Sequence, residues 1–267
     1  LQGKRDFKYD FLSENSLKSI EWNELKYNQP NYFFTNKNFE GVNEYEKGFS
    51  INTFFTVKAA GIKTHRDAVV IGFNKVELKI QIENHLSTLQ NTKNKFSDLK
   101  YKSLTYRPFD DRIIYFDTEL VERHRQEQIK HSFFKNHSLI LGRQTKNKEI
   151  NHFFISNKLS EMKTAESSTG SYHFPLYLYP ETNGQLSTDQ TTTRIPNLNT
   201  EIVNKIAKQL GLAFVPEKEF EGNVCVAKNE KVRPEYRGNF APIDILDYIY
   251  AVLHSPTYRE KYKEFLK

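Results

Sequence analysis

One short segment, residues 106–117 (YRPFDDRIIYFD), interleaves aromatic residues with charged residues. Its acidic residues are Asp110, Asp111 and Asp117. Carboxylates this close in sequence could hold a divalent cation or act as an acid/base pair. However, Arg107 and Arg112 lie among them and can neutralise them, and neighbouring residues on a strand point to opposite faces. We therefore expect a salt-bridged turn at Pro108, in which Asp110 and Asp111 orient the two arginines.

A second pattern has the spacing of a metal-dependent nuclease. Asp67, Glu77 and Lys79 form D-x9-E-x-K, in which two carboxylates would hold Mg²⁺ and the lysine would orient the attacking water. The pattern requires the Glu and the Lys to lie on a strand. Residues 75–86 are rich in Glu and Lys, which favours a helix instead. A Mg²⁺-dependent nuclease is therefore the less favoured alternative.

Motifs of several other enzyme classes are missing from the sequence. It contains no glycine-rich phosphate loop, no G-x-S-x-G, no H-E-x-x-H and no Asn/Asp-Pro-Pro-aromatic tetrapeptide. The one cysteine, Cys225, lies in an apolar run and is expected to be an inert, buried thiol. A single cysteine excludes an intrachain disulfide framework and fits a reducing cytoplasm. Apart from His124 and His131, which lie one heptad apart on an expected helix, the histidines show no metal-ligand spacing, so we expect surface histidines.

Basic side chains recur in the segments expected to be loops. The chain has a formal net charge of +6 and a pI near 9.1, which favours a polyanionic partner. Arg and Gln can read guanine and adenine edges in the major groove, whereas Lys mainly contacts phosphate. Each residue taken alone could equally be a solvated charge. The candidate DNA-binding residues are Lys63, His65, Arg66, Arg107, Arg112, Arg143, Gln144, Lys146, Arg194, Arg233 and Arg237.

These residues must be positioned by helices and strands, and the sequence pattern predicts an α+β protein. We expect mixed short-stranded sheets, flanking helices and a helical C-terminal end. Aromatic residues make up 14% of the chain, enough to build a core. A polar stretch at 91–102 indicates a boundary, and the long polar stretch 181–199 is expected to be mobile. The expected helices are 75–86, 118–131, about 200–210, one beginning at Pro242 and one after Ser255. The expected strands are 68–73, 113–115, 137–144, 151–157 and 172–180.

The chain lacks the run of about 20 apolar residues that a membrane span needs, so no membrane is expected as a partner. It begins at Leu1 without a signal-peptide pattern and ends inside an amphipathic segment. We therefore expect a piece of a larger cytoplasmic protein.

Several longer segments carry a resemblance to a known family. They are EYEKGFSINTFFTVKAAGIKTHRDAVVIGF, LTYRPFDDRIIYFD, FISNKLSE, FPLYLYP, PNLNTEIVNKIAKQLGLAFVPE and FAPIDILDYIYAVLHSPTYREKYKEFLK. Together they resemble the C-terminal specificity domain of Type ISP enzymes, which are single-polypeptide, ATP-dependent restriction–modification proteins. The resemblance implies that nuclease, motor and adenine N6-methyltransferase domains precede this part of the chain. It also makes the nuclease pattern less credible.

The resemblance implies a non-catalytic target recognition domain. It would position double-stranded DNA for adenine methylation by an upstream methyltransferase domain and license cleavage of unmodified sites. Residues 1–95 would be the part that adjoins the methyltransferase, and residues 96–267 the recognition core. This fragment would need no cofactor, while the parent enzyme would use S-adenosylmethionine, ATP and Mg²⁺. A basic protein-interaction module is the remaining alternative.

Overall fold

A computed structural model describes residues 3–25, 29, 32–88, 96–146, 149–180, 194–217 and 238–266. The chain forms two compact units, Leu1–Glu40 and Gly41–Lys267. The first unit contains helix α1 (Arg5–Glu14), which buries none of its residues. The expected functional division at residue 95 falls at the edge of a stretch outside the described residues, and it stays a prediction.

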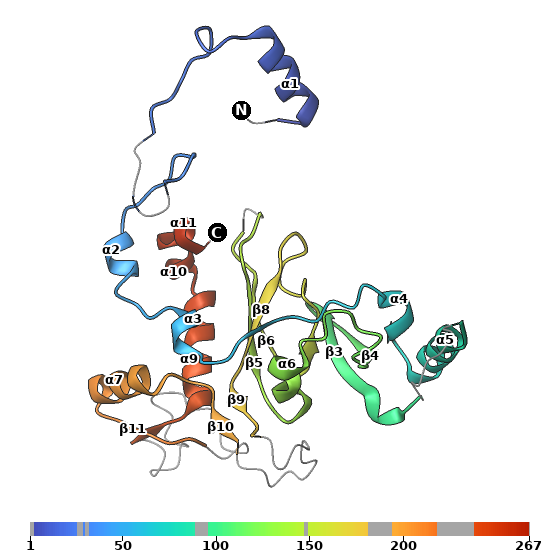
Figure 1. Ribbon diagram of the computed structural model, residues 1–267. Helices are drawn as coiled ribbons and strands as arrows, with labels where there is room; N and C mark the ends of the chain where they lie inside the picture. Colours follow the sequence, from blue (N-terminus) through green and yellow to red (C-terminus); the bar gives the residue numbers. More distant parts are fainter. Residues whose placement is uncertain are drawn as a thin grey trace. The chain divides into compact units, whose positions relative to one another are not determined.

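The second unit alternates short strands and helices, so the expected α+β class is confirmed (Figure 1). Among the described residues, no helix is both long and apolar enough to cross a membrane. The elements are α2 (Val42–Tyr45), α3 (Ile51–Phe54), β1 (Ala59–Ala60), α4 (Asp67–Val70), β2 (Ile71–Gly72), α5 (Lys75–Thr88), η1 (Asp98–Lys100), β3 (Tyr101–Arg107), β4 (Asp110–Tyr115), α6 (Gln126–Ile129), η2 (Lys130–Phe133), β5 (Ser138–Gly142), β6 (Phe153–Ser156), β7 (Leu159–Ser160), β8 (Ser171–Pro175), β9 (Tyr177–Leu178), β10 (Ile195–Pro196), α7 (Thr200–Leu210), β11 (Ala213–Phe214), β12 (Asn239–Phe240), α9 (Pro242–His254), α10 (Pro256–Lys261) and α11 (Lys263–Leu266).

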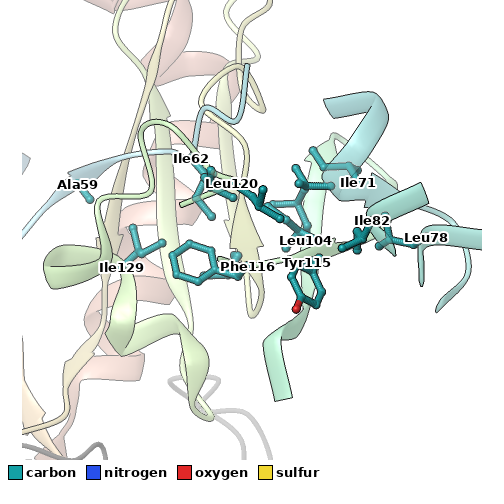
Figure 2. Close-up of a cluster of buried hydrophobic side chains, with 14 residues drawn as sticks. Ala59, Ile62, Ile71, Leu78, Ile82, Leu104, Tyr115, Phe116, Leu120 and Ile129 are labelled. Atoms are coloured by element: carbon teal, nitrogen blue, oxygen red, sulfur yellow. The ribbon is translucent and has the colours of Figure 1, made fainter. Parts of the chain in front are cut away.

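The first sheet has the order β2-β4-β3-β7 and is built around the antiparallel hairpin β3–β4. Its core is a cluster of buried apolar side chains (Figure 2). Leu104 and Ile114, which come from neighbouring strands, are fully buried in it together with Leu78 and Ile82 of α5. Burial of these side chains is the main favourable contribution to the stability of this sheet. Helix α5 is therefore part of the framework of the β3–β4 hairpin.

The second sheet has the order β1-β8-β5-β6, and all its pairings are antiparallel. Leu139 of β5 and Phe174 of β8 share a buried cluster with Ile202 of α7 and Leu246 of α9. Helix α9 runs beside this sheet in the ribbon view and contacts β6 (Figure 1). The C-terminal helices therefore close the core of the second sheet.

Residues 159–162 connect the two sheets. Leu159 pairs with Leu104 of β3, and the Ile62 N–H donates to the Ser160 carbonyl oxygen over 3.0 Å. The backbone of Gly61 passes so close that a Cβ there would lie 2.6 Å from the Glu161 carbonyl oxygen. Glycine is needed at this position because any side chain would collide with that backbone.

Local signals correctly predicted several helices. Asn199 caps α7 by accepting from the Glu201 and Ile202 N–H groups, and Gly211 ends the helix in the left-handed conformation. Pro242 begins α9, and Ser255 caps α10. Helix 75–86 is confirmed as α5, and the strands predicted within 113–115, 137–144, 151–157 and 172–180 are also found. Residues 181–193, within the expected mobile stretch, lie outside the described residues, as does Cys225.

The prediction of a helix over 118–131 was wrong. Only Gln126–Ile129 forms an α-helical turn, followed by the 3₁₀ turn η2. Contacts with distant residues keep residues 118–125 out of a helix. Leu120 and Val121 are buried in the core of the first sheet, and the Arg123 N–H donates to the Lys63 carbonyl oxygen. The predicted strand 68–73 is also mostly wrong, since only Ile71–Gly72 is a strand and α4 occupies the residues before it.

Candidate nucleic-acid interface

The β3–β4 hairpin places the charged residues of segment 106–117 around one tight turn. Arg107 pairs with Asp110 across the ladder, which leaves Pro108 and Phe109 as the two turn residues. Proline supplies the fixed backbone angle for the first of these positions. The expected turn at Pro108 is therefore confirmed, and strand β4 begins directly after Phe109.

Two arginines and two aromatic rings form what we call the arginine–aromatic stack, defined as Arg107, Tyr106, Arg112 and Phe73. The guanidinium carbons of Arg107 and Arg112 lie 4.1 and 3.9 Å from the centre of the Tyr106 ring. Arg112 also lies 4.7 Å from the centre of the exposed Phe73 ring. Cation–π contacts of this kind hold a guanidinium group in place without consuming its N–H donors.

The Tyr106 hydroxyl fixes the position of the ring in the stack by donating to Asp67 Oδ2 over 2.9 Å. Asp67 also accepts a hydrogen bond from the Thr64 hydroxyl. Burial raises the pKa of Tyr106, and the bond to Asp67 raises it further. The tyrosine is therefore neutral at physiological pH and serves as a fixed platform for both arginines.

The acidic residues of the segment have separate partners. Arg112 Nε and Nη2 donate to the two oxygens of Asp110 over 2.9 and 2.7 Å. The hydrogen bond from Arg112 is the main cause that lowers the pKa of Asp110. Asp111 instead accepts from Lys158 and from the Thr105 hydroxyl. The expected pairing is thus correct for Asp110 with Arg112, but the expected role of Asp111 was wrong.

Arg107 is paired with a residue distant in sequence. Its Nη1 donates to Glu161 Oε2 over 2.7 Å, and the Glu161 side chain is only 7% exposed. Burial raises the pKa of Glu161, while the Lys163 N–H and the Arg107 charge oppose this effect. Among the described residues, Nε and Nη2 of Arg107 and Nη1 of Arg112 make no hydrogen bond. These groups are still able to donate to a ligand.

A metal site is not assembled by these carboxylates. Asp117 pairs with Lys100 and accepts from the Glu119 N–H, so it has a structural role. Within the described part of the chain, no three His, Cys, Asp or Glu side chains come close enough together to hold a metal ion. Glu77 and Lys79 lie on helix α5, not on the strand that the nuclease pattern requires. The nuclease alternative therefore loses its structural basis.

The basic residues after Gly61 contact a second segment, residues 119–123. His65 Nδ1 lies 3.0 Å from Glu122 Oε2, and Arg66 Nη1 donates to the Leu120 carbonyl oxygen over 3.1 Å. The backbone of Lys63 pairs with Arg123 in an isolated bridge. His65 has a φ of 56°, so this loop contains a left-handed turn at a non-glycine residue.

The loop after β5 presents Arg143, Gln144 and Lys146 as exposed side chains. The Arg143 guanidinium lies 5.6 Å from the centre of the Tyr172 ring, and the Lys58 ammonium lies 5.3 Å from the same ring. Lys58 was not singled out from sequence because nothing local connects it to Tyr172. Only the pairing of β1 with β8 brings these residues together.

Arg194 has a different environment from the other candidates. Its side chain is only 10% exposed, and Nε and Nη2 donate to the two Glu217 oxygens over 2.7 and 2.6 Å. Its guanidinium carbon lies 3.8 Å from the centre of the Tyr177 ring. These contacts give Arg194 a structural role, and its part in DNA binding stays a prediction. Arg233 and Arg237 lie outside the described residues.

The expectation that the histidines lie on the surface was wrong for three of them, His131, His152 and His173, which are buried. His173 Nδ1 lies 3.1 Å from the Ser160 hydroxyl, whereas its Nε2 has no hydrogen-bond partner among the described residues. Burial lowers the pKa of His173 to about 4. The imidazole is therefore neutral at physiological pH.

A cavity beside β3 is another feature that sequence reasoning missed. It has a volume of about 300 Å³ and is lined by Lys102, Ser103, Ser132, Phe133, Phe134, Asn157, Lys158 and Leu159. Burial lowers the pKa of Lys102. No short motif marks these residues, because they come from three separate segments of the chain.

Residues 79–267 match the model of the Type ISP C-terminal specificity domain family. The chain belongs to this family. No protein of curated function matches the sequence significantly.

Solved structures with the same fold include DrdV in complex with DNA, at 16% identity and a TM-score of 0.66 over 98% of this chain. A nuclease-deletion mutant of the Type ISP restriction-modification enzyme LlaGI, in complex with a DNA substrate mimic, is 20% identical with a TM-score of 0.58 over 98% of this chain. The DNA-bound, ATP-dependent Type ISP enzyme LlaBIII is 16% identical with a TM-score of 0.54 over 81% of this chain. This chain spans 26%, 24% and 14% of the DrdV, LlaGI and LlaBIII chains, respectively.

Proposed function

We propose that this specificity domain recognises a target sequence in double-stranded DNA as part of a larger restriction–modification enzyme. The family match over residues 79–267 carries this proposal. The DNA complexes of DrdV, LlaBIII and LlaGI support it, because all three share the fold. Recognition would position the duplex for adenine N6 methylation by an upstream methyltransferase domain and would license cleavage of unmodified sites.

In this proposal, DNA contacts are divided among three groups of residues. Exposed Arg143, Gln144 and Lys146 would contact phosphates and base edges from the loop after β5. The unused N–H donors of Arg107 and Arg112 would contact phosphates beside the β3–β4 hairpin. Lys63, His65 and Arg66 would add contacts from the loop after Gly61.

The cofactors of the proposed enzyme would bind outside this domain. The sequence has no glycine-rich loop of the kind that holds nucleotide phosphates. LlaBIII is described as ATP-dependent, which supports ATP use by the complete enzyme. We propose that ATP, Mg²⁺ and S-adenosylmethionine serve the upstream motor, nuclease and methyltransferase domains, while this domain supplies DNA recognition only.

The salt dependence of DNA binding tests the proposal. The chain is bound to a duplex that it has enriched from a random pool, and log K is measured against log salt concentration. The Arg143→Ala variant should weaken binding and reduce the slope by about 1, because one phosphate contact is lost. Lys208→Ala is the matched control, since Lys208 is an exposed cation on α7 outside the proposed interface.

Two results would overturn the proposal. A slope of zero for the wild-type chain would leave no room for phosphate contacts and would favour the protein-interaction alternative. Mg²⁺-dependent cleavage by the chain that disappears in Glu77→Ala would restore the nuclease alternative.

A further inference from the structure

Phe109 is the most exposed large apolar residue of the described chain, with a relative exposure of 103%. It is the second residue of the two-residue turn at the tip of the β3–β4 hairpin. Its φ is 62°, in the left-handed region. A phenylalanine in this position gains no burial from the fold.

The turn chemistry favours a different residue at this position. A turn with proline first and a positive φ second prefers glycine or asparagine at the second position, because a Cβ is strained there. A bulky residue in the left-handed region is unusual and carries a cost that the surrounding structure must offset. The fold gains no burial from the ring, which leaves its surface accessible to a partner.

The hairpin holds this ring on a rigid base. Arg107 and Arg112 flank the turn and both lie against Tyr106, which is anchored to Asp67. Asp111, beside the turn, is tied to Lys158 of the neighbouring segment. An aromatic side chain on a rigid strand pair loses little conformational entropy when it binds.

The immediate surroundings of Phe109 favour nucleic acid over an apolar protein surface. Its chain neighbours are the exposed Pro108 and the ion-paired Asp110, and the next residues outward are charged. Protein docking sites usually have a contiguous apolar centre, whereas an apolar wedge whose chain neighbours are charged is typical of proteins that unstack a base step. The unused N–H donors of Arg107 and Arg112 beside the turn fit the phosphates that flank such a step.

We propose that Phe109 inserts into the base stack of the bound duplex as an apolar wedge, with Arg107 and Arg112 on the adjacent phosphates. The inference rests on the proposed DNA-recognition function and adds a residue that distorts the target. The wedge would make recognition depend on how easily the base step at the insertion point unstacks, in addition to direct reading of base edges.

The test uses the full chain and a duplex enriched by the wild-type protein from a random pool. The duplex is synthesised with 2-aminopurine in place of each adenine in turn, because emission of this base rises when it is unstacked. Variants Phe109→Ala, Phe109→Trp and Leu99→Ala are compared with the wild type. Leu99 is the matched control, since it is 85% exposed in η1, at the far end of strand β3 from the turn.

We expect 2-aminopurine emission to rise at one position of the duplex when the wild type binds. This rise should be absent with Phe109→Ala. Affinity of Phe109→Ala should fall roughly 5- to 150-fold, the range of a lost stacking contact. Phe109→Trp should retain both the affinity and the emission change, and Leu99→Ala should behave as the wild type. Thermal unfolding confirms that each variant is folded.

The results that overturn the wedge differ from those that overturn DNA recognition. If the wild type binds DNA with a salt-dependent affinity but Phe109→Ala binds equally well, only the wedge is refuted. Weaker binding without any change in 2-aminopurine emission would also refute insertion. If the wild-type chain binds no duplex at all, the proposed function fails together with the wedge.

Discussion

Replacing Arg107 by alanine tests the central ion pair of the candidate interface. The change removes the only cation paired with Glu161 in the described structure, and the Glu161 side chain is only 7% exposed when Arg107 is present. It also removes one guanidinium group from the Tyr106 ring. The buried partner predicts a loss of stability as well as a loss of DNA affinity.

The size of the expected loss of stability follows from the burial of the ion pair. Breaking a fully buried ion pair by removing one partner costs about 3–5 kcal/mol. Arg107 is 33% exposed, so solvent already screens part of the interaction, and we expect about 2 kcal/mol. For a folded unit of this size, that corresponds to a decrease in Tm of roughly 4–8 °C.

The loss of stability in Arg107→Ala should depend on pH, because burial raises the pKa of Glu161. A carboxyl group with a raised folded-state pKa destabilises the fold as pH rises above its unfolded value of 4.5. Without Arg107 this effect grows. The difference in unfolding free energy between wild type and Arg107→Ala should therefore be largest at neutral pH and shrink toward pH 4.5. Urea unfolding of both proteins across this range measures it.

The variant Glu161→Gln and the double variant separate charge from packing. Glu161→Gln removes the buried charge, so Arg107→Ala should cost much less in that background. An Arg107→Ala loss that is the same at pH 5 and pH 8, and is unaffected by Glu161→Gln, would refute the assigned pairing.

Three further predictions concern residues away from this pair. The pKa of His173 is lowered to about 4, so the unfolded state binds a proton that the folded state does not as pH falls from 6.5 toward 4. Up to about 3 kcal/mol of stability should be lost over that window, and His173→Gln should flatten the profile measured by urea unfolding. Asn199→Ala should cost about 1 kcal/mol, because α7 loses its cap, and an unchanged Tm would contradict the cap. Arg194→Ala should lower Tm more than Arg143→Ala does, since only Arg194 is nearly buried; equal values would contradict its structural role.

Part of the fold could be predicted because its causes are local. Asn199 with Gly211, Pro242 with Asp244, and Ser255 with Pro256 mark helix ends through hydrogen bonds and backbone angles within a few residues. The turn at Pro108 has the same local origin. The long ordered segments also predicted the family, which the match over residues 79–267 confirms.

The errors occurred where contacts between distant residues outweighed local preference. The charged stretch 118–131 has helix-favouring residues, but burial of Leu120 and Val121 and the backbone pairing of Arg123 with Lys63 prevent a continuous helix. Burial of His173 likewise results from the pairing of β8 with β1 and β5.

The sequence by itself determined the residue types at the interface, the basic net charge and the turn at Pro108 beside both arginines. Only the tertiary structure decided that Arg107 pairs with Glu161 and not with its neighbour Asp111. It also decided that Arg107 and Arg112 share one tyrosine ring, and that Phe109 is left fully exposed between them. The physical reason is that pairing of a charge and burial of a ring depend on which chain segments meet in space. Residues 159 and 160 are distant from β3 in sequence and meet it only through the β3–β7 strand pairing.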